Sequence, residues 1–298
     1  MAQGQAVGLI GIGLLGQALA QRLLGAGFSV TGFDLDAGKR AQLVQLGGQA
    51  ASSVGEVASS CNPIVLAVFS TDQVEQVLEQ ELASSERHEL RRTVLVASTC
   101  NPDRIALLAA RVAVRGLRLL DTPVSGSSGQ VARGEGVGLI GGDRAVVQEM
   151  HSVLHALFPT FFHVGEVGDG GRAKLAINLI LGLNRLALAE GLVFAERLGL
   201  DLASFLQVAR ASACYSQVMD VKGHKMVARD FAPEGRVIQH LKDVHLIIDQ
   251  AKERGQLLPL LGVHADVLES CVKAGEGDLD NCVVIEEIRR RVVAGPAQ

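Results

Sequence analysis

Short apolar segments alternate with stretches of helical periodicity through the first half of this chain. The apolar segments, each about the length of a strand, are 6–12, 28–34, 63–68, 93–98 and 117–121. The stretches with helical spacing between them are 14–26, 38–46, 71–82 and 101–114. Strands that alternate with helices of this length form parallel βαβ units, so the pattern predicts a doubly wound α/β domain with helices on both faces. Two more apolar segments, 136–141 and 161–164, extend the sheet.

The pattern changes after Gly165, beyond which we find no convincing strand. A long apolar helix is expected over 171–198, and Gly199 follows it in the manner of a C-terminal glycine cap. Because this helix is apolar on nearly every side, it must be buried among other helices or against another subunit. Further helices are expected near 201–211, 237–254, 259–274 and 280–293. We therefore expect an α/β domain over 1–165 and an all-helical domain over 166–298.

Composition excludes several classes of protein. An apolar fraction of 48% and a charged fraction of 20% are typical of a globular chain rather than a disordered one. A formal net charge of −4 and the near absence of Trp and Tyr speak against nucleic-acid binding. Segment 173–194 is the candidate for a membrane span, and its polar groups, from Lys174 to Glu190, argue against that role.

The cysteines and the N-terminus favour a cytoplasmic protein. The five cysteines are far apart and form no C-x-x-C pair, so each is expected to be a buried small hydrophobe in a reducing compartment. The first apolar strand begins close to Met1 without a basic segment before it, so no signal peptide is expected.

Residues 7–16 are typical of a strand that enters a G-x-G-x-x-G turn and then a helix. In such a turn Gly11 permits the sharp bend, and Gly13 lets the backbone approach a pyrophosphate. Gly16 allows the helix to pack on the strand, and the helix N-terminus offers N–H groups to phosphate oxygens. The strand and helix context makes this otherwise weak motif indicate a Rossmann-type dinucleotide site. The expected cofactor contacts are Gly11, Ile12, Gly13, Leu14, Leu15 and Gly16.

The second strand ends at Asp34, at the spacing expected for the carboxylate that binds the adenosine ribose. Asp36 adds another carboxylate to this tip, where a 2′-phosphate would need arginine or lysine. NAD is therefore favoured as the cofactor, while nearby Lys39 and Arg40 keep NADP open as an alternative.

Lys174 and Asn178 stand one helical turn apart on a mostly apolar segment just after the predicted α/β domain. An ordinary lysine pKa of ~10.4 is too high for a good base at neutral pH, but burial and neighbouring positive charge lower it. Beside a nicotinamide such a lysine is a candidate for proton transfer, with Asn178 bonded to the substrate hydroxyl or orienting the lysine. The alternative is a surface lysine at a helix end. Arg185 lies on the same stripe, too far along for the reaction centre.

Loop 121–129 follows a predicted strand at the edge where open α/β sheets bind ligands. Its small residues expose N–H groups and hydroxyls that suit an anionic head group, although an ordinary polar loop has the same composition. Lys242-Asp243, on the predicted helix 237–254, is a weaker candidate because charged pairs are common on exposed helix faces. The histidines have no metal-binding spacing, so no metal is assigned.

Together these segments resemble the β-hydroxyacid dehydrogenase family, which is related to 6-phosphogluconate dehydrogenase and includes 3-hydroxyisobutyrate dehydrogenases and tartronate-semialdehyde reductases. The resemblance covers nearly the full length, with the motifs in the family's order. The matching segments are 8–20 for the cofactor signature, 121–129 for the substrate loop D-x-P-V-S-G-G, 168–178 for the catalytic segment, Lys242-Asp243 for the late K-D pair, and Ser98-Thr99 with Pro102 for S-T-x-x-P.

The resemblance implies roles for the substrate-side residues. Ser125, Gly126 and Ser127 would hold a substrate carboxylate. Lys174 would be the general acid/base, and Asn178 would be its partner at the substrate. The C-terminal domain would serve substrate binding and association into a homodimer or homotetramer.

The resemblance also implies cofactor contacts at Thr99, near the nicotinamide ribose, and at Lys242, in the closed cleft. Some positions depart from the family pattern. Ser127 replaces the second glycine of the substrate loop, and Ala97 stands where an acid is usual. Val68-Phe69 replaces Leu-Pro, and residues 134–136 replace Gly-Thr-Leu. These departures bear on the identity of the substrate more than on the reaction class, because Lys174 is present.

We therefore expect reversible hydride transfer between a nicotinamide cofactor and a small 3-hydroxy acid or the corresponding semialdehyde, with Lys174 as general acid/base. One alternative is an NADPH-dependent reductase of a semialdehyde such as tartronate or succinic semialdehyde. Another is a non-catalytic NAD(P)-binding interaction protein. Retention of the lysine, the asparagine and the substrate loop together argues against the non-catalytic alternative.

Overall fold

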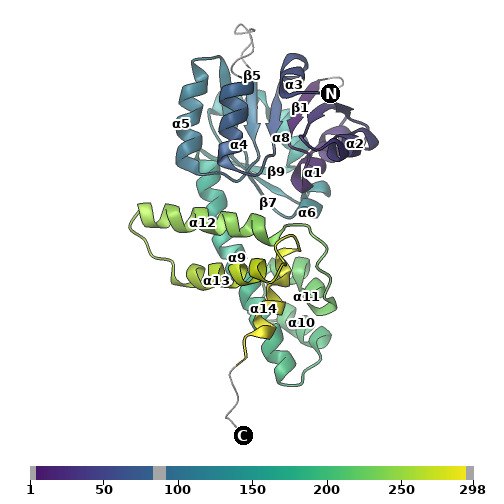
Figure 1. Ribbon diagram of the computed structural model, residues 1–298, viewed down its shortest axis with the longest axis vertical. Coiled ribbons are helices and arrows are strands. Elements are labelled where there is room, and N and C mark those ends of the chain that lie inside the picture. Colours follow the sequence, from purple (N-terminus) through teal and green to yellow (C-terminus); the bar gives the residue numbers. More distant parts are fainter. Residues whose placement is uncertain (1–4, 83–91, 293–298) are drawn as a thin grey trace. The chain divides into compact units, whose positions relative to one another are not determined.

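The computed structural model describes residues 5–82 and 92–292, whose path Figure 1 shows. The chain divides into two compact units, Met1–Lys174 and Leu175–Gln298. The boundary between them falls inside one helix, α9 (Asp169–Arg197). This helix supplies its first turn and Lys174 to the first unit and the rest of its length to the second.

A sheet of nine strands, counted over the described residues, is the centre of the first unit. The strands are β1 (Ala6–Ile10), β2 (Ser29–Phe33), β3 (Gln49–Ala50), β4 (Ile64–Leu66), β5 (Arg92–Val96), β6 (Leu117–Asp121), β7 (Val124–Ser125), β8 (Val137–Gly141) and β9 (Thr160–Gly165). Their order is β3-β2-β1-β4-β5-β6-β8-β7, and β9 pairs with β8. From β2 through β6 all neighbours are parallel, whereas β8 is antiparallel to β6 and β7.

The central strands of this sheet are buried on both faces, to which successive side chains point in turn. Leu9 and Leu95 pack in one core, and the next residue of each strand, Ile10 and Val96, packs in the other. The helices of the first core are α1 (Leu14–Gly25), α2 (Ala37–Gln45), α6 (Ser128–Ala132), α7 (Arg144–Glu149) and α8 (His151–Leu157). Those of the second core are α3 (Val54–Ser60), α4 (Thr71–Gln76), η1 (Val77–Leu82) and α5 (Pro102–Ala113), with α4 and α5 side by side in Figure 1.

The strands and helices predicted for the first unit are confirmed, with their ends shifted by one or two residues. The predicted helix 71–82 is divided into α4 and a π-helical segment, η1. The sequence did not predict β3, α3, β7 or α6. Two of these are two-residue strands and the others are helices of five and seven residues. Such elements are too short for hydrophobic periodicity to reveal.

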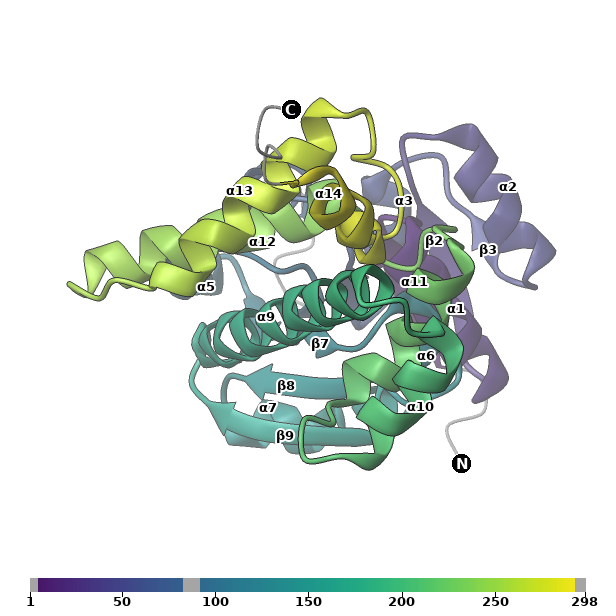
Figure 2. The same ribbon diagram turned by 90° about the horizontal axis from the view of Figure 1, so that it is seen from below.

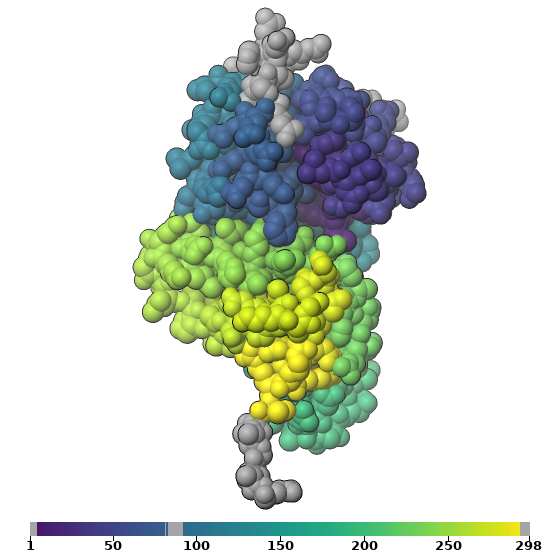
Figure 3. Space-filling model, in the orientation of Figure 1, coloured from purple at the N-terminus to yellow at the C-terminus, as the bar shows by residue number. Residues whose placement is uncertain are grey.

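The second unit is built of helices in its described part, with loops between them and one isolated β-bridge, Arg236–Asp280. After α9 come α10 (Leu202–Ala211), η2 (Met219–Gly223), α11 (His224–Ala228), α12 (Val237–Glu253), α13 (Pro259–Lys273), η3 (Asn281–Val283) and α14 (Val284–Arg290). Helices α12 and α13 lie side by side in Figures 1 and 2. The late helices α13 and α14, yellow-green and yellow in Figure 3, also pack together. The predicted fold class, an α/β unit followed by an all-α unit, is confirmed.

Two details of the second unit differ from the prediction. Segments η2 and α11 were not predicted, because residues 212–236 show no sustained apolar period. The predicted helix 280–293 begins as the 3₁₀ turn η3 and ends at Arg290, and position 293 lies outside the described residues.

Helix α9 is, within the described chain, the one helix long and apolar enough to cross a membrane. Its Leu186, Leu188 and Leu192 belong to the hydrophobic core of the second unit. Its polar residues Asn178 and Arg185 are buried as well. We therefore interpret α9 as a core helix.

The prediction for the cysteines is correct at four positions and wrong at one. Cys61, Cys100, Cys271 and Cys282 are buried and form no disulfide, whereas Cys214 is exposed. Cys214 lies in the turn after α10, where no apolar element covers it.

Candidate active site

The glycine turn after β1 has the geometry of a phosphate-binding turn. Gly11 has a φ of +92°, and a β-carbon there would lie 2.5 Å from the carbonyl oxygen of Ala67 on the neighbouring strand segment. A β-carbon on Gly16 would overlap the carbonyl oxygen of Gly11. By contrast, Gly13 faces open space at the N-terminus of α1, where Leu14 and Leu15 begin the helix. The turn therefore leaves room for a pyrophosphate beside unpaired helix N–H groups.

Asp34, at the carboxyl end of β2, is tied to this turn. Its Oδ2 accepts a hydrogen bond of 2.7 Å from the N–H of Ile12, and its Oδ1 accepts one of 3.0 Å from the N–H of Asp36. Lys39 Nζ lies 3.7 Å from the same Oδ1. Arg40 donates to the carbonyl oxygen of Asp34 and lies over the ring of Phe33. The carboxylate is thus fixed where a ribose would bind, with two cations beside it.

Thr99 follows the carboxyl end of β5 and is half-buried. The preceding hydroxyl, of Ser98, donates a hydrogen bond of 2.8 Å to the carbonyl oxygen of Val68, which holds the loops after β4 and β5 together. Because β1, β4, β5 and β6 are adjacent and parallel, their carboxyl ends share one edge of the sheet. The glycine turn and Thr99 therefore lie along the same edge.

The predicted substrate loop forms a short turn and a capped helix. Ser125 ends β7, and Gly126 has a φ of +143°, which favours glycine. Ser127 caps α6: its Oγ accepts from the N–H of Gln130, and its own N–H donates to Gln130 Oε1 at 2.9 Å. This capping box engages the N–H of Ser127, so the hydroxyl hydrogen is the donor that Ser127 has for a carboxylate.

Asp121, at the carboxyl end of β6, is a residue whose importance the sequence analysis missed. It is 2% exposed, and its Oδ2 accepts a hydrogen bond of 2.7 Å from the N–H of Gly171 in the first turn of α9. The N–H of Gly168 also bonds to this carboxylate. Burial raises the pKa of Asp121 to about 7, against the opposing effect of these backbone bonds and of Arg172. Asp121 therefore anchors the start of α9 to the ligand-binding edge of the sheet.

Glycines allow α9 to approach this close. A β-carbon on Gly170 would lie 2.6 Å from the carbonyl oxygen of Leu139 and 2.8 Å from that of Asp121. The signal in the sequence was the Gly170-Gly171 pair at a helix start, where alanine would otherwise be the better helix former.

Lys174 lies one turn after Gly171 on α9 and is 7% exposed. This burial contradicts the alternative of a surface lysine. Since Asp121 fixes the preceding turn of the helix, Lys174 is held near the edge that carries the glycine turn and Thr99. The first unit therefore gathers most of the predicted cofactor residues and the predicted acid/base.

Asn178, Lys242 and Asp243 come together within the second unit. Asn178 is 4% exposed, and its Nδ2 donates a hydrogen bond of 2.9 Å to Asp243 Oδ2. Lys242 Nζ lies 3.1 Å from the other oxygen of Asp243. The Lys242-Asp243 pair on α12 therefore contacts α9 through Asn178 and is not a solvated surface pair. The hydrogen bond from Asn178 Nδ2 to Asp243 fixes the orientation of the Asn178 amide.

Comparison with known proteins supports the resemblance over almost the whole chain. Residues 6–165 match the family described as the NAD binding domain of 6-phosphogluconate dehydrogenase. Residues 168–288 match the family described as NAD-binding of NADP-dependent 3-hydroxyisobutyrate dehydrogenase. The chain belongs to the β-hydroxyacid dehydrogenase family. It is accordingly an NAD(P)-binding oxidoreductase.

Several relatives in this family match end to end. The chain is 29% identical to 2-hydroxy-3-oxopropionate reductase of Escherichia coli (strain K12), over 95% of this chain and 96% of the relative. It is 29% identical to L-threonate dehydrogenase of the same organism, over 94% and 93%. A crystal structure of 3-hydroxyisobutyrate dehydrogenase from Salmonella typhimurium superposes with a TM-score of 0.85 at 30% identity, over 95% of this chain and 99% of that one.

Proposed function

We propose that this dehydrogenase catalyses reversible hydride transfer between a nicotinamide cofactor and a small 3-hydroxy acid or the corresponding semialdehyde. The observation that carries the proposal is Lys174, buried on a helix that Asp121 anchors at the ligand-binding edge of the sheet. The cofactor, when bound, supplies the hydride acceptor or donor at the nicotinamide ring. The open space at Gly13 and the fixed carboxylate of Asp34 fit such a dinucleotide.

The residues of the chain then have distinct roles. Lys174 Nζ accepts the hydroxyl proton in oxidation and donates it to the carbonyl oxygen in reduction. Asn178 orients the reacting group, and Asp243 holds its amide in place. The N–H of Gly126 and the hydroxyls of Ser125 and Ser127 hold the substrate carboxylate, since the N–H of Ser127 is engaged by Gln130. The remaining proposed cofactor contacts are Thr99 and Lys242.

The decisive experiment replaces the proposed acid/base. Lys174→Ala is expected to lower kcat by about 10²–10⁴-fold, because general acid–base catalysis by one side chain accelerates a reaction by about that factor. The Kd for the dinucleotide, measured from the fluorescence of bound NADH, should stay within a factor of about 3 of the wild-type value. Lys252→Ala, at an exposed lysine of α12, is the control and should leave both unchanged. Wild-type turnover in the Lys174 variant would refute the assignment and favour a non-catalytic NAD(P)-binding protein.

We propose NAD as the preferred cofactor. The supporting observation is the carboxylate of Asp34, fixed by two backbone N–H groups where a 2′-phosphate would have to sit. A panel of hydroxy acids and semialdehydes should therefore give a higher kcat/KM with NAD(H) than with NADP(H). Faster turnover with NADP(H) would indicate that Lys39 and Arg40 bind a 2′-phosphate and would favour the semialdehyde reductase alternative.

We also propose that the protein is a homodimer or homotetramer in the cytoplasm. Ile180 and Phe194 on α9 are 62% and 66% exposed, which supports burial of this helix against a second copy. Light scattering should give at least twice the chain mass, and Phe194→Glu should lower it. Five cysteines that form no disulfide support a reducing compartment, and fractionation of cells tests that location.

A further inference from the structure

Arg185 is a buried cation without a hydrogen-bond acceptor among the described residues. It lies in the middle of α9 and is 3% exposed, and its Nε and Nη2 atoms are inaccessible to solvent with no partner. Burial lowers the pKa of Arg185 to about 10, so the group keeps its charge at neutral pH. An uncompensated buried charge costs several kcal/mol, because the interior does not replace the water that the charge loses.

The buried carboxylate that acts on Arg185 from within the second unit is already committed. Asp280 Oδ2 accepts from Lys222 Nζ at 2.9 Å and from the N–H groups of Glu234 and Gly235 at 2.9 and 3.2 Å. Its Oδ1 accepts from the N–H of Cys282 at 3.1 Å. Asp280 therefore neutralises Lys222 rather than Arg185.

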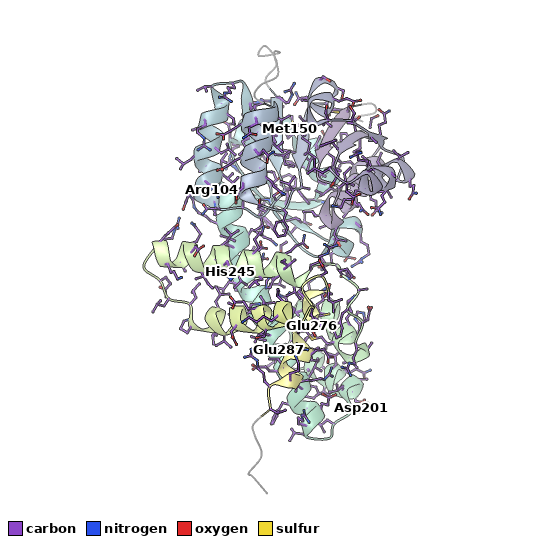
Figure 4. All side chains as sticks on the ribbon, viewed as in Figure 1. Arg104, Met150, Asp201, His245, Glu276 and Glu287 are labelled. Carbon is purple, nitrogen blue, oxygen red and sulfur yellow. The ribbon has the colours of Figure 1, made fainter. Side chains whose placement is uncertain are left out.

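Another carboxylate of this unit, Glu287, is paired with two arginines that follow it in the sequence. Glu287 bonds to Arg290 at 3.0 Å and to Arg291 at 2.9 Å, and Arg290 also binds Glu276. Glu276, in the loop after α13, and Glu287, on α14, are labelled in Figure 4. Both carboxylates are therefore paired with other cations, and neither bonds to Arg185 in the part of the chain that the structure describes.

A pair of histidines lies beside Arg185. His264 on α13 is fully buried, and its Nε2 lies 3.0 Å from Nε2 of His240 on α12. Both rings face α9 at Gly182, where a β-carbon would lie 2.8 Å from His240 Nε2 and 3.0 Å from His264 Nε2. Gly182 precedes Arg185 by one helical turn, so the rings and the guanidinium share one side of α9.

The charge of Arg185 acts on this pair directly. Burial and the positive charge of Arg185 lower the pKa of His264 to about 3, so its ring is neutral. The hydrogen bond between the two Nε2 atoms needs one donor and one acceptor. When His240 donates to His264 Nε2, the Nδ1 of His264 carries its hydrogen, and this buried Nδ1 has no acceptor in the described chain.

We propose that Arg185 and His264 form an internal binding site for a small monovalent inorganic anion of the halide class. The site offers two buried donors, Arg185 Nε–H and Arg185 Nη2–H, which lie on the same side of one guanidinium. When His240 is the donor in the histidine pair, His264 Nδ1–H is a further buried donor near this charge. A halide accepts from the guanidinium N–H groups and neutralises their charge, whereas a water molecule brings no charge. The inference is independent of the proposed reaction, because the site is described from the second unit alone.

The test measures thermal unfolding in chloride and in fluoride at equal ionic strength. Fluoride, which is strongly hydrated, is the comparison anion. Chloride should raise Tm saturably, by roughly 2–4 °C at saturation, since a ligand that binds the folded state stabilises it by mass action. Arg185→Met, which removes the charge but keeps a long apolar side chain, should abolish this increment. Arg197→Met, at an exposed arginine of the same helix, should retain it.

A second measurement uses the wild-type protein and therefore does not depend on whether Arg185→Met folds. Crystals of the wild-type protein grown in sodium bromide should show an anomalous peak within hydrogen-bond distance of Arg185 Nε. Water at that position, or a Tm that is equal in the two salts, overturns the proposal. So does a chloride increment that persists in Arg185→Met.

Discussion

The two units bury an ionisable group in opposite ways. In the first unit the carboxyl group of Asp121 accepts hydrogen bonds from the N–H groups of Gly168 and Gly171, so the chain itself supplies its partners. In the second unit the Nε and Nη2 groups of Arg185 donate to none of the described residues. A buried polar group with partners fixes the backbone around it, whereas one without partners indicates that something outside the chain completes it. Asp121 is accordingly structural, and Arg185 is a binding group.

The largest expected effect comes from breaking the Asp121 anchor through the backbone. Gly170→Ala places a β-carbon against two carbonyl oxygens, and neither can move without shifting β6 or β8. We expect a loss of about 3 kcal/mol or more in the free energy of unfolding. Urea denaturation measures it.

Gly191→Ala, on the same helix with nothing within 4 Å, is the matched control for Gly170→Ala. It should raise the free energy of unfolding by about 0.5–1 kcal/mol, because alanine is the better helix former. Equal stability of the two variants would contradict the anchor.

A smaller loss of stability is expected at Gly182, where an added β-carbon meets side chains rather than backbone. Gly182→Ala pushes a methyl group into the His240–His264 contact, and the rings have to turn aside. We expect a loss of about 1–3 kcal/mol in the free energy of unfolding. The chloride increment of Tm should shrink along with it. An unchanged increment would separate the histidine pair from the Arg185 site.

The smallest effect concerns the protonation of Asp121. Its folded-state pKa of about 7 lies above the ordinary value of 3.8, so the folded state keeps a proton that the unfolded state has lost. This contribution to stability is complete below pH 3.8 and is lost as the pH rises through 7. Asp121→Asn removes it, so the stability of the variant relative to wild type should be higher at pH 8 than at pH 5. If the free energy of unfolding of Asp121→Asn differs from that of wild type by the same amount at pH 5 and at pH 8, Asp121 is not the titrating group.

What the sequence revealed depended on how local the signal was. The glycine turn, Asp34 and the Lys174–Asn178 spacing were readable because each lies within one strand–turn–helix unit or one helix. The anchor at Asp121 was not, since it joins residues 50 apart and its partner is a backbone N–H. The surroundings of Arg185 were equally hidden. Its histidine neighbours come from two other helices, and no pattern in a single segment predicts that three helices meet there.

The position of the unit boundary within α9 has a practical consequence for dissecting the protein. No flexible connector separates the halves, so any cut that frees one of them must sever a continuous helix. A fragment ending at Lys174 would keep the amine without the turns that follow it, and the complementary fragment would begin mid-helix with its apolar side chains bare. Work on this enzyme therefore requires the intact polypeptide.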